Sequence, residues 1–284
     1  MKVLISILLA SISLAACSKS DKDNGPSNLP ESTTKNVSYG SDAFQVMDVY
    51  LPAGRSSSST KAMLLVHGGG WTGGDKSEFD PYISALKQRF PDYAFFNVNY
   101  RLANNNVNKF PAQENDLKSA MEFVSGKLGE YKISGTFVYL GFSAGAHLAM
   151  LQGYKHTSPV KPAAIVTFFG PTDLVEMHNN PISPYAPLLL EALLGFTPQQ
   201  NLSAYQQSSP AFFVNSSAAP TMILHGGQDN VVAPSQSDIL KNKLQAAGVA
   251  HEYIVYPNEG HGWFGTTLDD SFNKIQAFLS AKVK

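Results

Sequence analysis

The run Gly141-Phe142-Ser143-Ala144-Gly145 lies between an apolar segment, Thr136–Leu140, and a helix-length segment, Ala144–Tyr154. The pattern predicts a strand that turns sharply into a helix at Ser143, because such a turn needs small residues on both sides of the serine. The turn lifts the hydroxyl clear of the backbone at a helix N-terminus, where partial positive charge favours a developing anion. The motif alone is weak evidence, so a nucleophilic role for Ser143 depends on this context and on suitable partner residues.

Short apolar runs alternate with helix-length segments on both sides of this turn, which is typical of the βα units of a mainly parallel sheet. The predicted strands are Phe44–Tyr50, Ala62–Val66, Tyr93–Asn99, Thr136–Leu140, Ala163–Phe168, Thr221–Leu224 and Glu252–Tyr256. The predicted helices are Ser77–Phe90, Gln113–Lys127, Ala144–Tyr154, Ser235–Ala247 and Leu268–Ala281. The regular alternation of Phe44–Tyr50 predicts an antiparallel edge strand. We therefore expect one α/β domain over residues 36–284, with a mainly parallel central sheet flanked by helices.

Residues 177–214 break this alternation. The segment from Met177 to Val214 holds many prolines and the apolar run Leu188–Leu190. A long insertion in a compact α/β domain often covers a binding site, and this one lies between strands whose ends carry candidate functional residues. We expect a small cap here, with a helical excursion that has no role in binding as the alternative.

The composition favours a globular protein and excludes several classes. The 284 residues are 43% hydrophobic and 15% charged, with a formal net charge of −1. Because there is no basic excess to neutralise phosphates, nucleic-acid binding is not expected. The single cysteine, Cys17, rules out an internal disulfide framework, a thiolate zinc cluster and a CxxC redox site.

The N-terminus has the features of a secretion signal. Lys2 precedes a mostly apolar segment, Val3–Ala16, that is too short for a stable membrane span. Its end, Leu14-Ala15-Ala16-Cys17, resembles a bacterial lipobox, which implies that residues 1–16 are removed and that Cys17 is lipidated. An ordinary signal peptide is the alternative. Residues 17–35 are then a flexible tether, and we expect a lipid-anchored membrane protein of the bacterial cell envelope, facing the periplasm or the cell surface.

His261 and Asp229 are the candidate partners of Ser143. After a turn of this type the acid comes next in the chain and the histidine last. His261 lies in a glycine-flanked loop after the strand Glu252–Tyr256, and Asp229 follows the strand Thr221–Leu224. An acid in this position holds the imidazole in one tautomer and stabilises its charged form. Asp173 competes for the role of the acid, but we interpret it as a turn-capping residue.

The run His67-Gly68-Gly69-Gly70-Trp71 follows the predicted strand Ala62–Val66. Consecutive glycines leave backbone N–H groups unobstructed, so this loop can supply hydrogen-bond donors to an oxyanion. The N–H of Ala144, the residue after the serine, supplies a further donor. Trp71 and Trp263 both follow glycine motifs, and either a role in lining the substrate cleft or simple packing beneath the loops is compatible with the sequence.

Together these motifs make the chain resemble an α/β-hydrolase of the hormone-sensitive-lipase-like and bacterial carboxylesterase group, and in particular a feruloyl-esterase/kynurenine-formamidase-like branch. The matching stretches run from Ala62 to Gly262 and are residues 67–76, 99–102, 110–113, 141–149, 225–229 and 260–262. The resemblance implies Ser143, Asp229 and His261 as a catalytic triad. It implies Gly69, Gly70 and Ala144 as the oxyanion hole.

The expected activity is that of a serine carboxylic ester hydrolase acting through an acyl-enzyme on a small-molecule or glycan-linked ester. No metal or organic cofactor is expected. Two alternatives stay open: an amide hydrolase with the same triad, acting as a formamidase or peptidase, and a catalytically inactive binding lipoprotein. The sequence does not specify the acyl group, the alcohol or the oligomeric state.

Overall fold

The computed structural model describes residues 28–104, 107–156 and 159–284. The predicted signal peptide, the predicted lipidation site Cys17 and most of the predicted tether lie outside these residues. Within them, no helix is both long enough and apolar enough to cross a membrane.

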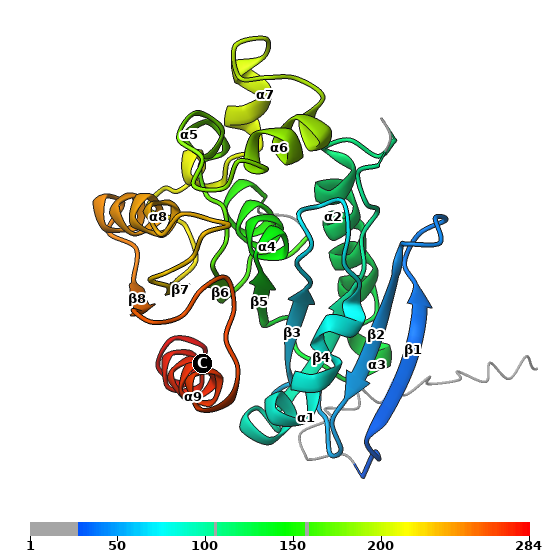
Figure 1. Ribbon diagram of the computed structural model, residues 1–284. Helices are drawn as coiled ribbons and strands as arrows, with labels where there is room; N and C mark the ends of the chain where they lie inside the picture. Colours follow the sequence, from blue (N-terminus) through cyan, green and yellow to red (C-terminus); the bar gives the residue numbers. More distant parts are fainter. Residues whose placement is uncertain (1–27, 105–106, 157–158) are drawn as a thin grey trace, which may run out of the picture.

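An eight-stranded sheet forms the centre of the domain, in the order β1-β2-β4-β3-β5-β6-β7-β8 (Figure 1). The strands are β1 Ser32–Ser38, β2 Val46–Leu51, β3 Lys61–Val66, β4 Tyr93–Val98, β5 Phe137–Phe142, β6 Ala164–Phe168, β7 Thr221–Gly226 and β8 His251–Tyr256. The six strands β3 to β8 are parallel to one another, while β2 is antiparallel to both β1 and β4. The mainly parallel sheet predicted from the apolar runs is therefore confirmed.

The N-terminal edge of the sheet differs from the prediction. The predicted strand Phe44–Tyr50 corresponds to β2, which is antiparallel as expected but not an edge strand, because β1 pairs with its outer side. β1 also shows that the predicted tether, residues 17–35, is too long, since the fold begins by Ser32. This strand is mostly exposed and polar, so it has no apolar pattern to reveal it. Lys35 binds the buried Asp48 at 2.9 Å and holds β1 in place.

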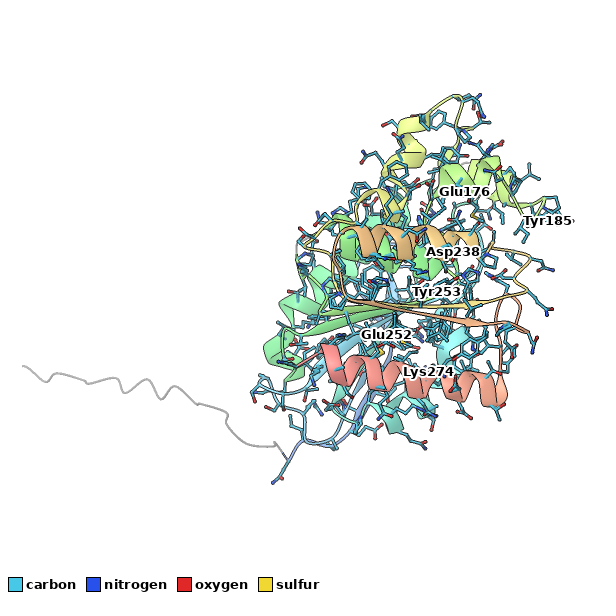
Figure 2. All side chains as sticks on the ribbon, turned by 90° about the vertical axis from the view of Figure 1, so that its left-hand side faces the viewer. Glu176, Tyr185, Asp238, Glu252, Tyr253 and Lys274 are labelled. Carbon is cyan, nitrogen blue, oxygen red and sulfur yellow. The ribbon has the colours of Figure 1, made fainter. Side chains whose placement is uncertain are left out.

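Helices cover both faces of the sheet. They are η1 Lys76–Phe79, α1 Asp80–Arg89, α2 Ala112–Gly126, α3 Leu128–Tyr131, α4 Ala144–Lys155, α8 Ser235–Ala246 and α9 Gly265–Lys282, together with those of the β6–β7 connection. Successive side chains of β3 point to opposite faces of the sheet. Leu65 packs with α1 and α9, and Leu64 packs with α2 and α4. In Figure 2, α8 and α9 lie on opposite sides of β8, which carries Glu252 and Tyr253.

The connection from β6 to β7 contains the segment predicted as a cap. It folds as α5 Leu174–Asn179, α6 Ala186–Leu194, α7 Leu202–Gln207 and the short helix η2 Pro210–Phe212. Figure 1 shows α5, α6 and α7 gathered above α4, at the carboxyl end of the parallel strands. Leu190 and Leu193 of α6 are buried in the core, whereas Leu188 is exposed. One face of α6 thus attaches the insertion to the domain.

Two glycines bring the β5–α4 turn against the rest of the sheet. A Cβ on Gly145 would lie 2.1 Å from the carbonyl oxygen of Val66, at the end of β3. A Cβ on Gly141 would lie 2.5 Å from the backbone nitrogen of Ala146. No side chain fits at either distance, so the small residues predicted around Ser143 are required by close backbone contacts.

We expect Gly145→Ala to lower the free energy of unfolding by roughly 3 kcal/mol, because the added methyl group forces α4 away from β3. The measurement is urea-induced unfolding of both proteins at neutral pH. Gly126→Ala is the matched control, since nothing lies within 4 Å of a Cβ at this position, the last residue of α2. The control should be neutral or stabilising by up to about 1 kcal/mol. Equal unfolding midpoints for both variants would contradict this account.

Candidate active site

Ser143 lies in the sharp turn between β5 and α4. Its backbone has φ 52° and ψ −119°, in a region that side chains other than glycine rarely adopt. Its N–H donates to the carbonyl of Phe168 on the neighbouring strand β6 at 2.9 Å, and its carbonyl accepts the N–H of His147 at 3.0 Å. These bonds fix the backbone at this position and leave the hydroxyl facing a cavity.

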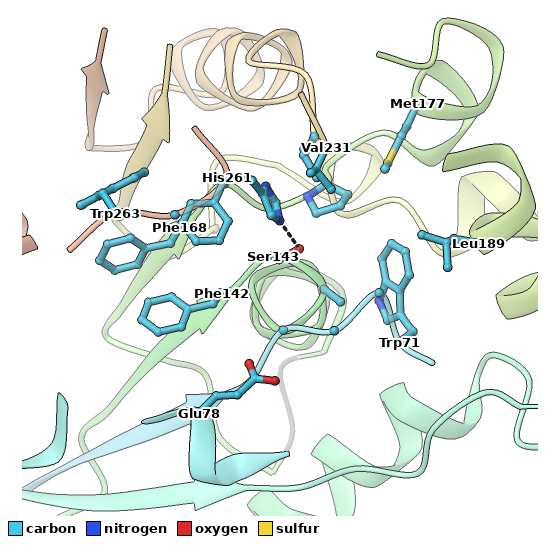
Figure 3. Close-up of a pocket in the computed structure, with 18 of the residues that line it drawn as sticks. Trp71, Glu78, Phe142, Ser143, Phe168, Met177, Leu189, Val231, His261 and Trp263 are labelled. Carbon is cyan, nitrogen blue, oxygen red and sulfur yellow. Dashed lines mark hydrogen bonds between the residues drawn. The ribbon is translucent and has the colours of Figure 1, made fainter. Parts of the chain in front are cut away.

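His261 lies in the loop that follows β8, as the sequence predicted. Its Nε2 is 2.9 Å from Oγ of Ser143 (Figure 3). Its Nδ1 is 2.7 Å from Oδ2 of Asp229. The ring of Phe169 packs against the imidazole, with ring centroids 4.6 Å apart. With the Nδ1 proton donated to Asp229, Nε2 can accept the hydroxyl proton of Ser143.

Asp229 is buried in the loop after β7, where its two carboxylate oxygens have different partners. Oδ1 accepts the backbone N–H groups of Val231 at 2.8 Å and Val232 at 2.9 Å. Oδ2 faces His261 and also lies 3.2 Å from Nε2 of His225. Burial raises the pKa of Asp229, but the hydrogen bonds from His225, His261 and the backbone outweigh it and hold this pKa well below its usual range.

His225 is a supporting residue that the sequence reasoning missed. It is fully buried, its Nε2 lies 3.0 Å from the carbonyl of Val232, and its Nδ1 lies 2.7 Å from Oγ of Ser237. An Nε2–H tautomer donates to both Val232 and Asp229, and accepts the Ser237 hydroxyl at Nδ1. Its place at the end of β7, four residues before Asp229, is the sequence signal that points to this role.

Asp173, the competing acid, is not part of this cluster. Its carboxylate accepts the backbone N–H groups of Val175 at 3.0 Å and Glu176 at 3.1 Å at the start of α5. It is a helix N-cap, in agreement with the turn-capping interpretation.

The glycine-rich loop after β3 lies beside Ser143. Gly69 and Gly70 have φ values of 101° and 57°, and a Cβ on Gly69 would lie 2.2 Å from the carbonyl oxygen of Gly73. Among the described residues, neither the Gly69 nor the Gly70 N–H has a hydrogen-bond acceptor. Both glycines and Ala144 line the same cavity as the Ser143 hydroxyl. The geometry therefore brings the three predicted oxyanion donors to the serine.

Trp71 and Trp263 both line this cavity, and both are also packed and hydrogen-bonded. The indole N–H of Trp263 donates to Oγ of Ser271 at 2.8 Å. That of Trp71 donates to Nδ1 of His147 at 3.1 Å, and His147 donates from Nε2 to the carbonyl of Ser208 at 2.6 Å. Each tryptophan therefore both lines the cavity and is packed in the fold, so the two roles that the sequence left open occur together.

The cavity in front of Ser143 has a volume of about 450 Å³ and a mostly apolar lining. Phe142, Phe168 and Trp263 lie on one side in Figure 3, and Met177 and Leu189 of the insertion lie on the other. The lining also includes the carboxylate of Glu78, which the sequence did not single out. Within the described ranges, no three His, Cys, Asp or Glu side chains group as a metal site.

The parallel sheet, the serine turn and the order in which Ser143, Asp229 and His261 follow β5, β7 and β8 define an α/β-hydrolase fold. Comparison with known proteins gives the family: the BD-FAE model matches residues 47–244, more than half of the chain. The chain belongs to the BD-FAE family.

Several individual relatives are named as esterases, and others as dipeptidyl peptidases. The chain is 22% identical over 242 residues to esterase LipC of Mycobacterium tuberculosis, covering 81% of this chain and 59% of LipC. It is also similar to a solved truncated carbohydrate esterase from gut microbiota, with 26% identity, a TM-score of 0.77 and coverage of 91% of this chain and 99% of that one. A bifunctional GH43-CE protein of Bacteroides eggerthii has the same identity and TM-score, over 89% of this chain and 38% of that one. This chain thus spans about three fifths of the length of LipC.

Two buried histidines make the stability of the domain depend on pH. Burial lowers the pKa of both His67 and His147 to about 4, although a backbone carbonyl bonded to each ring acts in the opposite direction. Between about pH 6.5 and pH 4 the unfolded chain therefore binds more protons than the folded protein at these positions. Stability is full above this range and is lost as the pH falls through it.

We expect each of these histidines to remove about 2 kcal/mol of unfolding free energy between pH 7 and pH 5. His147→Gln should reduce stability at pH 7, because the bond to Trp71 is altered, but it should lose about 2 kcal/mol less than the unsubstituted protein when the pH is lowered. Urea unfolding at the two pH values measures both quantities. An identical pH dependence of the two proteins would contradict the assignment of His147 as a buried neutral group.

Proposed function

We propose that the chain is a serine carboxylic ester hydrolase in which Ser143 is the nucleophile, His261 the general base and Asp229 the residue that orients the base. The observation that carries this proposal is the continuous hydrogen-bonded path from Oγ of Ser143 through the imidazole of His261 to Asp229, at 2.9 and 2.7 Å. The named esterases among the relatives support the same reaction class.

The proposed reaction has two half-reactions. Oγ of Ser143 transfers its proton to Nε2 of His261 and attacks the ester carbonyl, and the resulting oxyanion accepts hydrogen bonds from the N–H groups of Gly69, Gly70 and Ala144. Collapse of this intermediate breaks the bond to the alcohol oxygen, which takes the proton from His261. Water then attacks the acyl-enzyme with His261 again as the base, which releases the acid and restores the serine.

The negative charge of Asp229 favours these reaction steps. The lowered pKa of Asp229 keeps its carboxylate ionised, so it stabilises the imidazolium form of His261 that each half-reaction produces. The four hydrogen bonds to Asp229 also leave it little freedom to turn away from the imidazole. Because the cavity lining is mostly apolar, the attraction between these charges is weakly screened.

The cavity also indicates the substrate class. A volume of about 450 Å³ suits a small or medium ester, and Met177 and Leu189 extend the lining on the side of the insertion. We propose that residues 177–214 act as a cap over the substrate. The similarity to a carbohydrate esterase supports an ester linked to a glycan as the substrate.

Ser143→Ala should lower turnover of 4-nitrophenyl acetate by about four orders of magnitude or more, because the nucleophile is removed while the fold is kept. The unsubstituted protein should be labelled covalently by a fluorophosphonate probe, and Ser143→Ala should not be labelled. Ser280→Ala, at an exposed position of α9, is the matched control and should behave as the unsubstituted protein.

A folded protein that is neither labelled nor active on esters would refute the proposal and favour the binding-lipoprotein alternative. Faster turnover of N-formyl amides or peptides than of matched esters would instead favour the amide-hydrolase alternative.

We further propose that the protein is anchored to the bacterial cell envelope through lipid on Cys17. The motif Leu14-Ala15-Ala16-Cys17 supports this, and its position outside the described residues leaves the question to experiment. Expressed in a bacterium with radiolabelled palmitate, the protein should carry label and sediment with membranes, whereas Cys17→Ser should be unlabelled and largely soluble. Equal labelling and sedimentation of the two proteins would exclude lipidation at Cys17.

A further inference from the structure

Glu78 places a carboxylate in the wall of the catalytic cavity. It lies in η1, the short helix that follows the glycine-rich loop, and Figure 3 shows its side chain directed toward that loop below Ser143. The position of η1 is fixed by Asp75, whose carboxylate accepts the N–H of Ser77 at 2.8 Å and the side-chain amide of Asn99 at 2.7 Å. Glu78 is thus held at the cavity by the backbone of a defined turn.

The carboxylate of Glu78 is close to the reacting atoms. The point that a Cβ on Gly68 would occupy lies 3.5 Å from Cβ of Ser143 and 3.8 Å from Oε2 of Glu78. The separation between these two atoms is therefore no greater than the sum of these distances, which one sugar or phenyl ring can span. Glu78 is therefore within reach of a substituent on a ring that is attached to the ester bound at Ser143.

No protein group in the described part of the chain binds the Glu78 carboxylate. Its oxygens have neither a hydrogen bond nor an ion pair there, and the neighbouring Lys76 is bound to Asp48 at 3.0 Å. Glu78 is also exposed, so its oxygens are accessible to a ligand. By contrast, the carboxylates of Asp75 and Asp229 both accept hydrogen bonds from protein groups.

An unpaired carboxylate at this place has opposite effects on different esters. It repels the negative charge that develops on the ester carbonyl oxygen, so it slows hydrolysis of a substrate that makes no contact with it. A substrate hydroxyl that donates to it forms a charge-assisted hydrogen bond, which is among the stronger hydrogen bonds in proteins. The net effect favours esters that carry a hydroxyl group at the right distance.

We infer that Glu78 is a specificity-determining residue that accepts hydrogen bonds from hydroxyl groups of the substrate. The inference rests on the ester-hydrolase activity proposed above and adds the chemical class that the site selects: hydroxylated esters over esters of the same shape without hydroxyl groups. The hydroxyl groups come either from a sugar on the alcohol side or from a phenol on the acyl side, and both present the same donor to the carboxylate.

Two matched substrate pairs distinguish these sources. The first is a mono-O-acetylated methyl xyloside with free hydroxyl groups and cyclohexyl acetate, which lacks them. The second is methyl 4-hydroxycinnamate and methyl cinnamate. The measured quantity is the kcat/KM of the hydroxylated ester divided by that of its partner without hydroxyl groups. It is determined for the unsubstituted protein, Glu78→Gln and Glu78→Leu.

In at least one pair, we expect Glu78→Leu to lower this ratio about tenfold or more, because a charge-assisted hydrogen bond is lost. The kcat/KM for the partner without hydroxyl groups should rise, because the repulsion of the oxyanion is removed. Glu78→Gln should be intermediate, since it keeps an acceptor without the charge. The pair that responds identifies the alcohol or the acyl side.

Glu252→Leu and Glu252→Gln are the matched controls, because Glu252 is exposed on β8 at the far edge of the sheet. Their ratios should equal those of the unsubstituted protein, and unfolding midpoints verify that every variant is folded. Ratios in both pairs that change less than threefold in Glu78→Leu would overturn the inference while leaving the ester-hydrolase proposal intact. Absence of turnover and of fluorophosphonate labelling in the unsubstituted protein would overturn both.

Discussion

The site depends on one close backbone contact, where Gly145 at the start of α4 meets the end of β3 at Val66. This contact, together with the hydrogen bond from Ser143 N–H to Phe168, holds the serine backbone at φ 52°. A side chain other than glycine in this kind of backbone region costs of order 1–3 kcal/mol, so the conformation persists only where the surroundings enforce it. Here three adjacent parallel strands, β3, β5 and β6, do so together.

The same arrangement brings together residues that are distant in the sequence. The loops after β7 and β8 leave the sheet at the same carboxyl end of the parallel strands as the serine turn, and there Asp229 and His261 reach Ser143. His225 extends the cluster into the core, where the Val232 carbonyl and the Asp229 carboxylate, which can only accept, require the proton on its Nε2. The polar groups of the site are therefore arranged by regular secondary structure rather than by flexible loops alone.

Much of this was predictable because buried parallel strands are continuous apolar runs, and every strand of that kind was located in the sequence. The polar strand β1 was missed for the same reason, since its position depends on backbone pairing and on the bond from Lys35 to Asp48. The spatial meeting of Ser143, Asp229 and His261 followed from their order along the chain. Their catalytic roles, the role of the cap and the lipid on Cys17 stay predictions until tested.

Side chains that act through three-dimensional neighbours were harder to predict. Glu78 reads in the sequence as an ordinary exposed residue near a helix start, and only the turn of η1 beside the glycine-rich loop places it in the cavity. His225 precedes Asp229 in the chain, so the order serine, acid, histidine does not point to it, and only the structure shows it as a buried partner of Asp229. Trp71 and Trp263 could not be assigned to cleft or core because each serves both.

The strand order also separates the N-terminal end of the sheet from the candidate reacting groups. The chain enters the sheet at β1, one edge strand, whereas the loops that carry Asp229 and His261 follow β7 and β8 at the other edge. A mechanical load applied through the N-terminal segment is borne first by the β1–β2 hydrogen bonds and by the pair of Lys35 and Asp48. The protein can therefore be pulled or tilted from this end while the loops that hold the reacting groups stay out of the line of force.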